Sequence, residues 1–414
     1  MKRNFDVAVI GAGAVGCACA LWNQDTGLDV ALIDKSGPTD AASYGNAGIF
    51  SVTGFAPLNS PGLIRRLPKL MFDNGSPLSI DWVYALTHLP WMLKFLRACA
   101  PDKVAHITEQ LANITNHVEA GFMPLAKRAG AEDLIKDIAS IYIYSTKEYF
   151  EGDAASIESR RRLGADMDVI DQDEVHEMEP HLRAPVYKAL RSNENKYIIN
   201  PGEYIERLKK CFASDGGEFI NAAAMSCSEQ GDQVQVRLDD GSTLTCNKLV
   251  IAAGAHSKKI VGSGAEKLPL DTERGYHVVY HGAQSKLTRP VGWSSGGLYA
   301  TPMETGLRIA GTVELAGLNK PPSPRRMEYI AGMANKMFDG LGEPDETWMG
   351  FRPTLPDSVP VIGLAPGKRN ILLAFGHQHL GLTMSGITGR VIADLVQGRA
   401  PNFDISGYSP SRFG

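Results

Sequence analysis

Paired cysteines, excess positive charge and long apolar runs are all missing from this sequence of 414 residues. There is no CxxC pair and no metal-ligand spacing, which excludes a disulfide scaffold and predicts buried free thiols in a reducing compartment. A net charge of -4 gives no electrostatic case for a nucleic-acid partner. No stretch approaches the roughly 20 apolar residues of a membrane-spanning helix. The six scattered cysteines are Cys17, Cys19, Cys99, Cys211, Cys227 and Cys246.

What remains is the composition of an ordinary globular protein, with 43% hydrophobic and 21% charged residues. The length fits two or three domains of about 150 residues each. The first strand follows the N-terminus at once and Gly11 interrupts its apolar run, so we expect no signal peptide. The sequence therefore predicts a cytoplasmic protein, with no metal site.

Hydrophobic periodicity divides the chain into alternating strands and helices. We find no internal repeat. We expect a strand at 5–10, a helix at 14–26, a strand at 29–34, helices over 55–135, a strand at 140–146, successive strands over 216–257, an antiparallel sheet over 273–315, and a strand at 370–376 followed by a helix to about 396.

The first strand runs into the glycine-rich turn GAGAVG, which is typical of dinucleotide binding. Gly11 allows the tight turn, Gly13 lets the backbone approach a pyrophosphate, and Gly16 lets the helix pack closely. Asp34 ends the second strand, where an acid can bind ribose hydroxyls and would repel the extra phosphate of NADP. Ala14, Val15 and Lys35 complete the predicted nucleotide contacts.

Three later segments favour FAD over NAD. They are a small-residue loop at 43–50, a strand and small-residue turn at 248–257, and a strand end with a helix N-terminus at 370–386. Such a helix N-terminus can stabilise negative charge on a reduced flavin. The further predicted cofactor contacts are Ser43, Asn46, Ala47, Gly48, Ala224, Ala253, Gly254, Gly350, His377, His379, Leu380, Gly381, Leu382 and Thr383.

Read together, these segments resemble the FAD-dependent D-amino-acid oxidase superfamily, and within it bacterial D-amino-acid dehydrogenases and hydroxy-D-proline dehydrogenases. The motifs that carry the resemblance are SYGNAGIF (43–50), PLDTERGYHVVY (269–280), GFRPTLPDSVPVIG (350–363) and GHQHLGLTMS (376–385). The resemblance implies an α/β fold with a Rossmann-like FAD-binding domain and an α+β substrate domain built on a mixed sheet. We expect residues 1–55, 200–265 and 348–414 in the first domain, and 56–199 and 266–347 in the second.

Some relatives bind FAD covalently through a cysteine in the C-terminal half or a histidine in the N-terminal loop. This chain has no cysteine after Cys246, and its first histidine is His88. We therefore expect non-covalent FAD.

A flavoenzyme that oxidises amino acids must hold the substrate carboxylate, and the planar fork of arginine suits that task. The family motif places Arg352 next to the flavin. Arg274 is a second candidate, with a structural ion pair as the alternative. Tyr276 and Tyr299 fit either the pocket or the core of the predicted sheet, and His379 fits either a catalytic or a hydrogen-bonding role.

The resemblance implies oxidative deamination of a D-amino acid to an imino acid, or formation of a cyclic imine from hydroxy-D-proline. The alternatives are a glycine- or sarcosine-type oxidase and an electron-relaying flavoprotein subunit. Residues 62–99 combine basic and aromatic side chains, a pattern that fits either an amphipathic cap or an interfacial helix on a membrane that holds a quinone acceptor.

Overall fold

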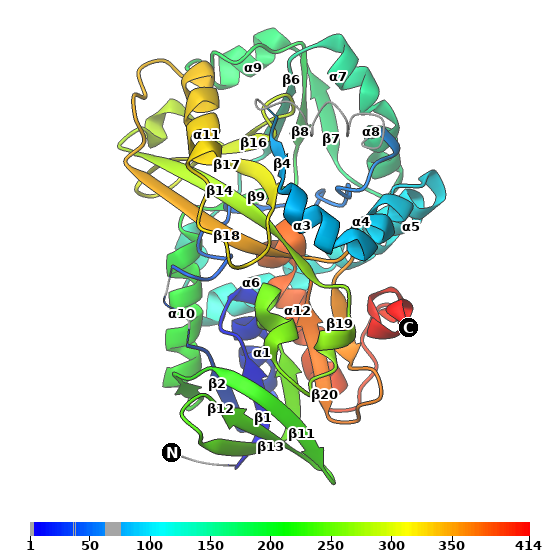
Figure 1. Ribbon diagram of the computed structural model, residues 1–414. Coiled ribbons are helices and arrows are strands. Elements are labelled where there is room, and N and C mark those ends of the chain that lie inside the picture. The colour runs from blue at the N-terminus through cyan, green and yellow to red at the C-terminus, as the bar shows by residue number, and fades with distance from the viewer. Residues whose placement is uncertain (1–3, 36, 38, 63–75) are drawn as a thin grey trace.

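The computed structural model describes residues 4–35, 37, 39–62 and 76–414. Two large sheets dominate it, one above the other in Figure 1. All six cysteines are free thiols, as predicted, and Cys211 alone among them is only half-buried. Among the described residues, no helix is both long and apolar enough to cross a bilayer.

The first sheet has the Rossmann-like core that the sequence predicts. Its parallel strands run in the order β10 (Glu218–Ile220), β2 (Val30–Ile33), β1 (Asn4–Ile10), β13 (Thr243–Ile251) and β20 (Ile371–Phe375). The central strands are buried on both faces, which is why they are continuous apolar runs. Antiparallel strands complete the sheet, namely β12 (Gln233–Leu238) and β11 (Ala224–Gln230) beside β13, and β19 (Val361–Leu364) beside β20.

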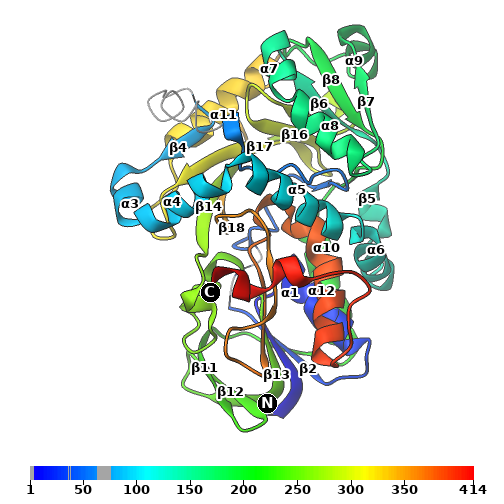
Figure 2. The same ribbon diagram turned by 90° about the vertical axis from the view of Figure 1, so that its right-hand side faces the viewer.

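Two helices from opposite ends of the chain pack on this sheet. They are α1 (Ala14–Gln24) and α12 (Gly381–Val396), which lie side by side in Figure 2. A Cβ atom at Gly389 would lie 2.5 Å from the backbone carbon of Ala18, so the two helices approach as closely as glycine allows. The close contact fixes the N-terminus of α12 relative to the β1–α1 turn.

The second sheet is mixed, as predicted. Its order is β18 (Glu346–Thr354), β14 (Asp271–His281), β17 (Gly306–Leu315), β16 (Leu298–Pro302), β15 (Val291–Trp293), β6 (Ser140–Tyr144), β8 (Lys188–Ser192) and β7 (Met167–Ile170), with β4 (Leu78–Ile80) beside β17. The pairs β15–β6 and β17–β4 are parallel and the others antiparallel. The long helix α11 (Pro324–Met337) packs on β14 and β17.

The remaining elements are helical, apart from a small sheet of β3 (Ile49–Phe50), β9 (Lys196–Ile198) and β5 (Ile135–Lys136). The helices are α3 (Trp82–Thr87), α4 (Leu89–Ala98), α5 (Pro101–Thr115), α6 (Val118–Arg128), α7 (Lys147–Gly152), α8 (Ala154–Arg162), α9 (Gln172–Met178) and α10 (Pro201–Ser214), with short 3-10 turns η1 (Glu132–Leu134), η2 (Gly254–Lys259), η3 (Ala265–Lys267), η4 (Gln284–Lys286), η5 (Gln378–Leu380), η6 (Ser406–Tyr408) and η7 (Pro410–Phe413).

The predicted domain boundary at residue 348 falls inside β18. That strand pairs along its whole length with β14 of the second sheet. Helix α6, from the predicted substrate domain, packs against α12 of the predicted FAD-binding domain. The chain therefore crosses between the two sheets at β18, and residues 348–354 help to build the second sheet.

Candidate active site

A large cavity extends between the two sheets, from the β1–α1 turn to β14 and β18. Its volume is about 1580 Å³, above the roughly 300–1,000 Å³ typical of a site for one small ligand. The cavity therefore has room for a dinucleotide and a second, smaller molecule.

The β1–α1 turn has the geometry that its glycines predict. Gly11 has a φ of +105°, and a Cβ there would lie 2.5 Å from the carbonyl oxygen of Ala252. A Cβ at Gly16 would lie only 1.7 Å from the carbonyl oxygen of Gly11, so Gly16 is required for packing and does not line the cavity. Gly13 differs, because a Cβ there would meet only Ser43 Oγ, at 3.4 Å. The backbone at Gly13 thus faces open cavity.

Two side chains hold this turn from outside it. The Ala12 N–H donates to Asp34 Oδ2 at 2.5 Å, and the Ala14 N–H donates to Ser43 Oγ at 3.2 Å. Asp34 and Ser43 both line the cavity. The predicted ribose acid and the 43–50 loop therefore meet at the nucleotide end.

The second sheet clamps the loop of residues 39–46. Trp348 Nε1 donates to the carbonyl of Thr39 at 2.9 Å. Arg308 Nη1 donates to the carbonyls of Tyr44 (3.2 Å) and Asn46 (2.8 Å), and its burial lowers the pKa of this guanidinium to about 10. His277 Nδ1 lies 3.1 Å from the carbonyl oxygen of Gly45. Trp348, Arg308 and His277 were not predicted as site residues, since nothing local in the sequence pairs them with this loop.

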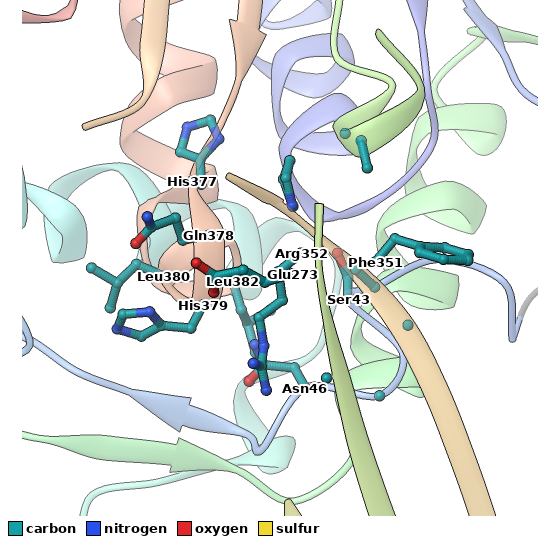
Figure 3. Close-up of a pocket in the computed structure, with 18 of the residues that line it drawn as sticks. Ser43, Asn46, Glu273, Phe351, Arg352, His377, Gln378, His379, Leu380 and Leu382 are labelled. Atoms are coloured by element: carbon teal, nitrogen blue, oxygen red, sulfur yellow. The ribbon is translucent and has the colours of Figure 1, made fainter. Parts of the chain in front are cut away.

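The turn η5 forms the wall at the N-terminus of α12 (Figure 3). His377 is buried, its Nε2 lies 3.0 Å from Thr388 Oγ1, and burial lowers its pKa to about 3. Gln378 adopts a φ of +49°, and its Nε2 donates to Ser358 Oγ at 3.0 Å. His379 lines the cavity, and burial, followed by the charge of Arg352, lowers its pKa to about 4. Both histidines are therefore neutral at pH 7.

The predicted carboxylate-binding residue, Arg352, lies in the cavity wall. Its Nη1 donates to the carbonyl of Thr312 at 2.9 Å. The guanidinium lies flat over Gly275 on the adjacent strand, where a Cβ would come within 2.4 Å of Nη2. Burial lowers the pKa of Arg352 from its usual value of 12.5. Among the ion pairs of the described residues none includes Arg352, which leaves its charge available to a ligand.

Glu273 lies directly opposite Arg352 in the β14–β18 register. Its side chain is 3% exposed, and Oε2 is buried without a hydrogen-bonding partner. Burial raises the pKa of this carboxyl to about 7, against a smaller lowering effect of Arg352. Figure 3 shows the two side chains together beside η5. Glu273 was not predicted as a site residue, although it lies within the motif PLDTERGYHVVY.

Arg274 and Tyr276 were also predicted to contact the substrate, but their polar groups lie on the opposite face of β14. Arg274 is 1% exposed and donates to the carbonyls of Gly317 (2.7 Å), Lys320 (2.7 Å) and Pro321 (3.0 Å). The Tyr276 hydroxyl donates to Glu314 Oε2 at 2.5 Å, and Arg274 Nη1 lies 3.4 Å from the same oxygen. Arg274 does not line the cavity, and Tyr276 lines it without presenting its hydroxyl. The geometry favours a structural role for this group.

The other predicted residues divide into two sets. Tyr299 lines the cavity beside Tyr142, with ring centroids 5.7 Å apart, and burial raises its pKa to about 12. Gly48 and Thr383 lie behind the wall, where Thr383 Oγ1 accepts a hydrogen bond from the Ser51 N–H at 3.2 Å. The predicted cofactor contacts that line the cavity are Gly11, Gly13, Ala14, Val15, Asp34, Lys35, Ser43, Asn46, Ala47, Ala224, Ala253, Gly254, Gly350, His377, His379, Leu380, Gly381 and Leu382.

Comparisons with known proteins agree with this geometry. A family model described as FAD dependent oxidoreductase matches residues 6–395. A D-amino-acid oxidase of Bradyrhizobium diazoefficiens is 32% identical over 421 residues, which cover 100% of both chains. The solved structure of glycine oxidase from Geobacillus kaustophilus has a TM-score of 0.75 at 21% identity over 99% of each chain. That of L-proline dehydrogenase from P. horikoshii has a TM-score of 0.74 at 16% identity, covering 100% of this chain and 98% of the other. These two likenesses show the fold.

Proposed function

Because the chain belongs to the family of FAD-dependent oxidoreductases that includes D-amino-acid oxidase, with FAD as cofactor and amino acids as substrates, we propose that it is a D-amino-acid dehydrogenase. The reaction transfers a hydride from the substrate α carbon to the cofactor and gives an imino acid. Water then converts the imino acid to a 2-oxo acid and ammonia. A cyclic substrate such as hydroxy-D-proline gives a cyclic imine instead.

The residues at the nucleotide end fit FAD. The backbone faces open cavity at Gly13, and a Cβ at Gly254 would have nothing within 4 Å. Asp34 is placed for the ribose hydroxyls, and the N-terminus of the 16-residue helix α12 is placed for the flavin end. When bound, FAD supplies the hydride-accepting chemistry, and the protein supplies binding and orientation.

Arg352 is the single observation that carries the proposal. Among the described residues no carboxylate forms an ion pair with this guanidinium, so it can bind a ligand carboxylate, and its two-pronged geometry fixes the orientation of that ligand. Orientation matters because the α C–H bond must point at the cofactor for hydride transfer. The neutral imidazole of His379 adds no second positive charge beside it.

The D configuration is proposed from the end-to-end relative, which is a D-amino-acid oxidase. A glycine- or sarcosine-type oxidase would use the same carboxylate contact with a smaller amine. An electron-relaying subunit would have no use for a buried cation in a cavity of this size.

The electron acceptor that we propose is a membrane quinone. Helices α3 and α4 expose a set of apolar side chains, the α3–α4 apolar face: Val83 (71% exposed), Leu86 (74%), Leu89 and Leu93. Of these, Leu86 and Leu89 also line the cavity. The basic residues Lys94 and Arg97 are exposed on α4. Apolar and basic groups together suit the surface of an anionic bilayer. Arg65, Arg66 and Lys69, which the sequence analysis included, lie outside the described residues.

Anaerobic reduction of the bound flavin tests the proposal. We expect D-amino acids or D-proline derivatives to bleach the flavin absorbance, their L-epimers to leave it unchanged, and a soluble quinone to reoxidise it faster than air. Anaerobic bleaching by glycine or sarcosine alone, together with hydrogen peroxide formed in air at the rate of substrate oxidation, would replace the proposal with the oxidase. Acid precipitation tests the non-covalent attachment of FAD separately, since non-covalent FAD stays in the supernatant when the protein precipitates.

A further inference from the structure

Glu273 lies in the wall of the cavity, and none of the described residues donates a hydrogen bond to its Oε2. A buried carboxylate oxygen without a hydrogen bond is costly, because it loses its hydration without compensation. A buried polar group of this kind is explained when a bound ligand supplies the missing hydrogen-bond donor.

The charges around Glu273 define what that ligand is. Arg352, which pairs with Glu273 in the strand register, is a cation on β18. Asp271 is the acid on the same strand as Glu273, and His379 on η5 is neutral. Asp271 is itself occupied, since it accepts hydrogen bonds from the Tyr84 hydroxyl and from the Thr272 N–H (2.7 Å). Glu273 and Arg352 thus present one negative and one positive group on the same face of the sheet.

We propose that Glu273 binds the α-ammonium group of the substrate and accepts one proton from it, while Arg352 binds the carboxylate. This deepens the proposed function, but it rests on the oxidation of an α-amino acid and not on the D configuration. The opposite charges on neighbouring strands match the zwitterion of an amino acid, whose two charged groups are attached to one carbon.

The proton transfer has a chemical reason. An ammonium nitrogen has no lone pair, and a lone pair on nitrogen must form the C=N bond as the hydride leaves Cα. The substrate N–H bond breaks, the proton moves to Glu273, and the neutral amine remains. The C–H bond then breaks, its electron pair leaves with the hydride to FAD, and the product is an iminium ion. Glu273 later returns its proton to solvent.

The test uses the FAD-loaded Glu273→Gln variant, which keeps the shape of the side chain but can neither accept the proton nor carry the charge. With whichever amino acid reduces the wild-type flavin, the anaerobic reduction rate of the wild type should rise with pH to a plateau above about 7. The variant should lose on the order of 100-fold in this plateau, as expected when a general base is removed. Its rate should continue to rise at higher pH, where the substrate amine deprotonates in solution.

A binding measurement supplies a readout other than activity. Cyclopentanecarboxylate has a carboxylate and no amine, so it should bind near Arg352 and be repelled by ionised Glu273. Its affinity for the wild type, followed by the perturbation of the flavin spectrum, should fall by up to about tenfold per pH unit above pH 7. Glu273→Gln should abolish that fall. Glu346→Gln, at the exposed far end of β18, should behave as the wild type in both measurements.

A Glu273→Gln variant with wild-type pH profiles for both reduction and carboxylate binding would overturn the proposal. If Gln at this position does not fold, Glu273→Asp carries the test, because it keeps the charge and must keep the pH-dependent repulsion of cyclopentanecarboxylate. Reduction by an L-amino acid or by glycine would refute the D configuration alone, and the Glu273 test then proceeds with that substrate.

Discussion

Gly275 provides the sharpest test of how the substrate site is built, since a single methyl group there displaces Arg352. In the Gly275→Ala variant the new Cβ would lie 2.4 Å from Nη2 and 2.5 Å from Cζ of Arg352. The guanidinium must therefore retreat by about 1 Å to reach an ordinary contact of 3.4 Å, and its hydrogen bond to the Thr312 carbonyl must lengthen or break.

The expected cost follows from that displacement. A charge-assisted hydrogen bond contributes about 1.5–3 kcal/mol, and a misplacement of about 1 Å can reduce a rate roughly 100-fold. We expect kcat/KM to fall about 10- to 100-fold, with FAD content and melting temperature nearly unchanged, because the moving atoms are the end of a side chain and not backbone.

Single-turnover flavin reduction, measured beside FAD occupancy and thermal unfolding, is the assay. The matched control is Gly332→Ala in α11, where the added Cβ has nothing within 4 Å and the higher helix propensity of alanine should stabilise by up to about 1 kcal/mol. A Gly275→Ala enzyme with normal substrate affinity and normal reduction rate would refute the placement of Arg352 against Gly275.

Three further outcomes are expected. Arg352→Lys keeps the charge but loses the two-pronged geometry, so kcat/KM should fall roughly 10- to 150-fold at constant FAD content; loss of FAD instead would assign this arginine to the fold. Gly13→Val should abolish FAD retention while the apoprotein keeps its melting temperature, because only Ser43 Oγ is near, whereas Gly16→Ala should unfold the protein. Burial raises the pKa of Glu273 from 4.5 to about 7, so the native state binds the extra proton and stability falls as pH rises between these values. The Glu273→Gln apoprotein should therefore gain at most about 3 kcal/mol over wild type at pH 8 and nothing at pH 4.5, checked by denaturant unfolding.

The nucleotide end could be predicted because its determinants are local. Gly11, Gly16 and Asp34 act through a turn and its two flanking strands, and the spacing of these residues in the sequence fixes their spacing in space. The same holds for the buried parallel strands, whose continuous apolar runs follow from burial on both faces.

The substrate end could be predicted only in part, because it depends on which face of a strand meets the cavity. Side chains alternate along β14, so Glu273 and Gly275 face Arg352 while Arg274 and Tyr276 turn to Glu314. A shift of one residue exchanges the two sets, and the sequence TERGYH has polar groups in both. The choice is made by the pairing with β18 and β17, whose residues opposite TERGYH lie more than 30 residues away in the sequence.

The clamp on the 39–46 loop has a consequence for how this enzyme can change. The loop lines the nucleotide end of the cavity, yet Trp348, Arg308 and His277, which hold it, belong to strands β18, β17 and β14, where we propose that the substrate binds. A substrate sheet exchanged with that of a relative would have to bring matching side chains, or the loop beside FAD would lose its support. New substrate specificity is therefore easier to reach through single side chains on β14, β16 and β18 than through replacement of the whole sheet.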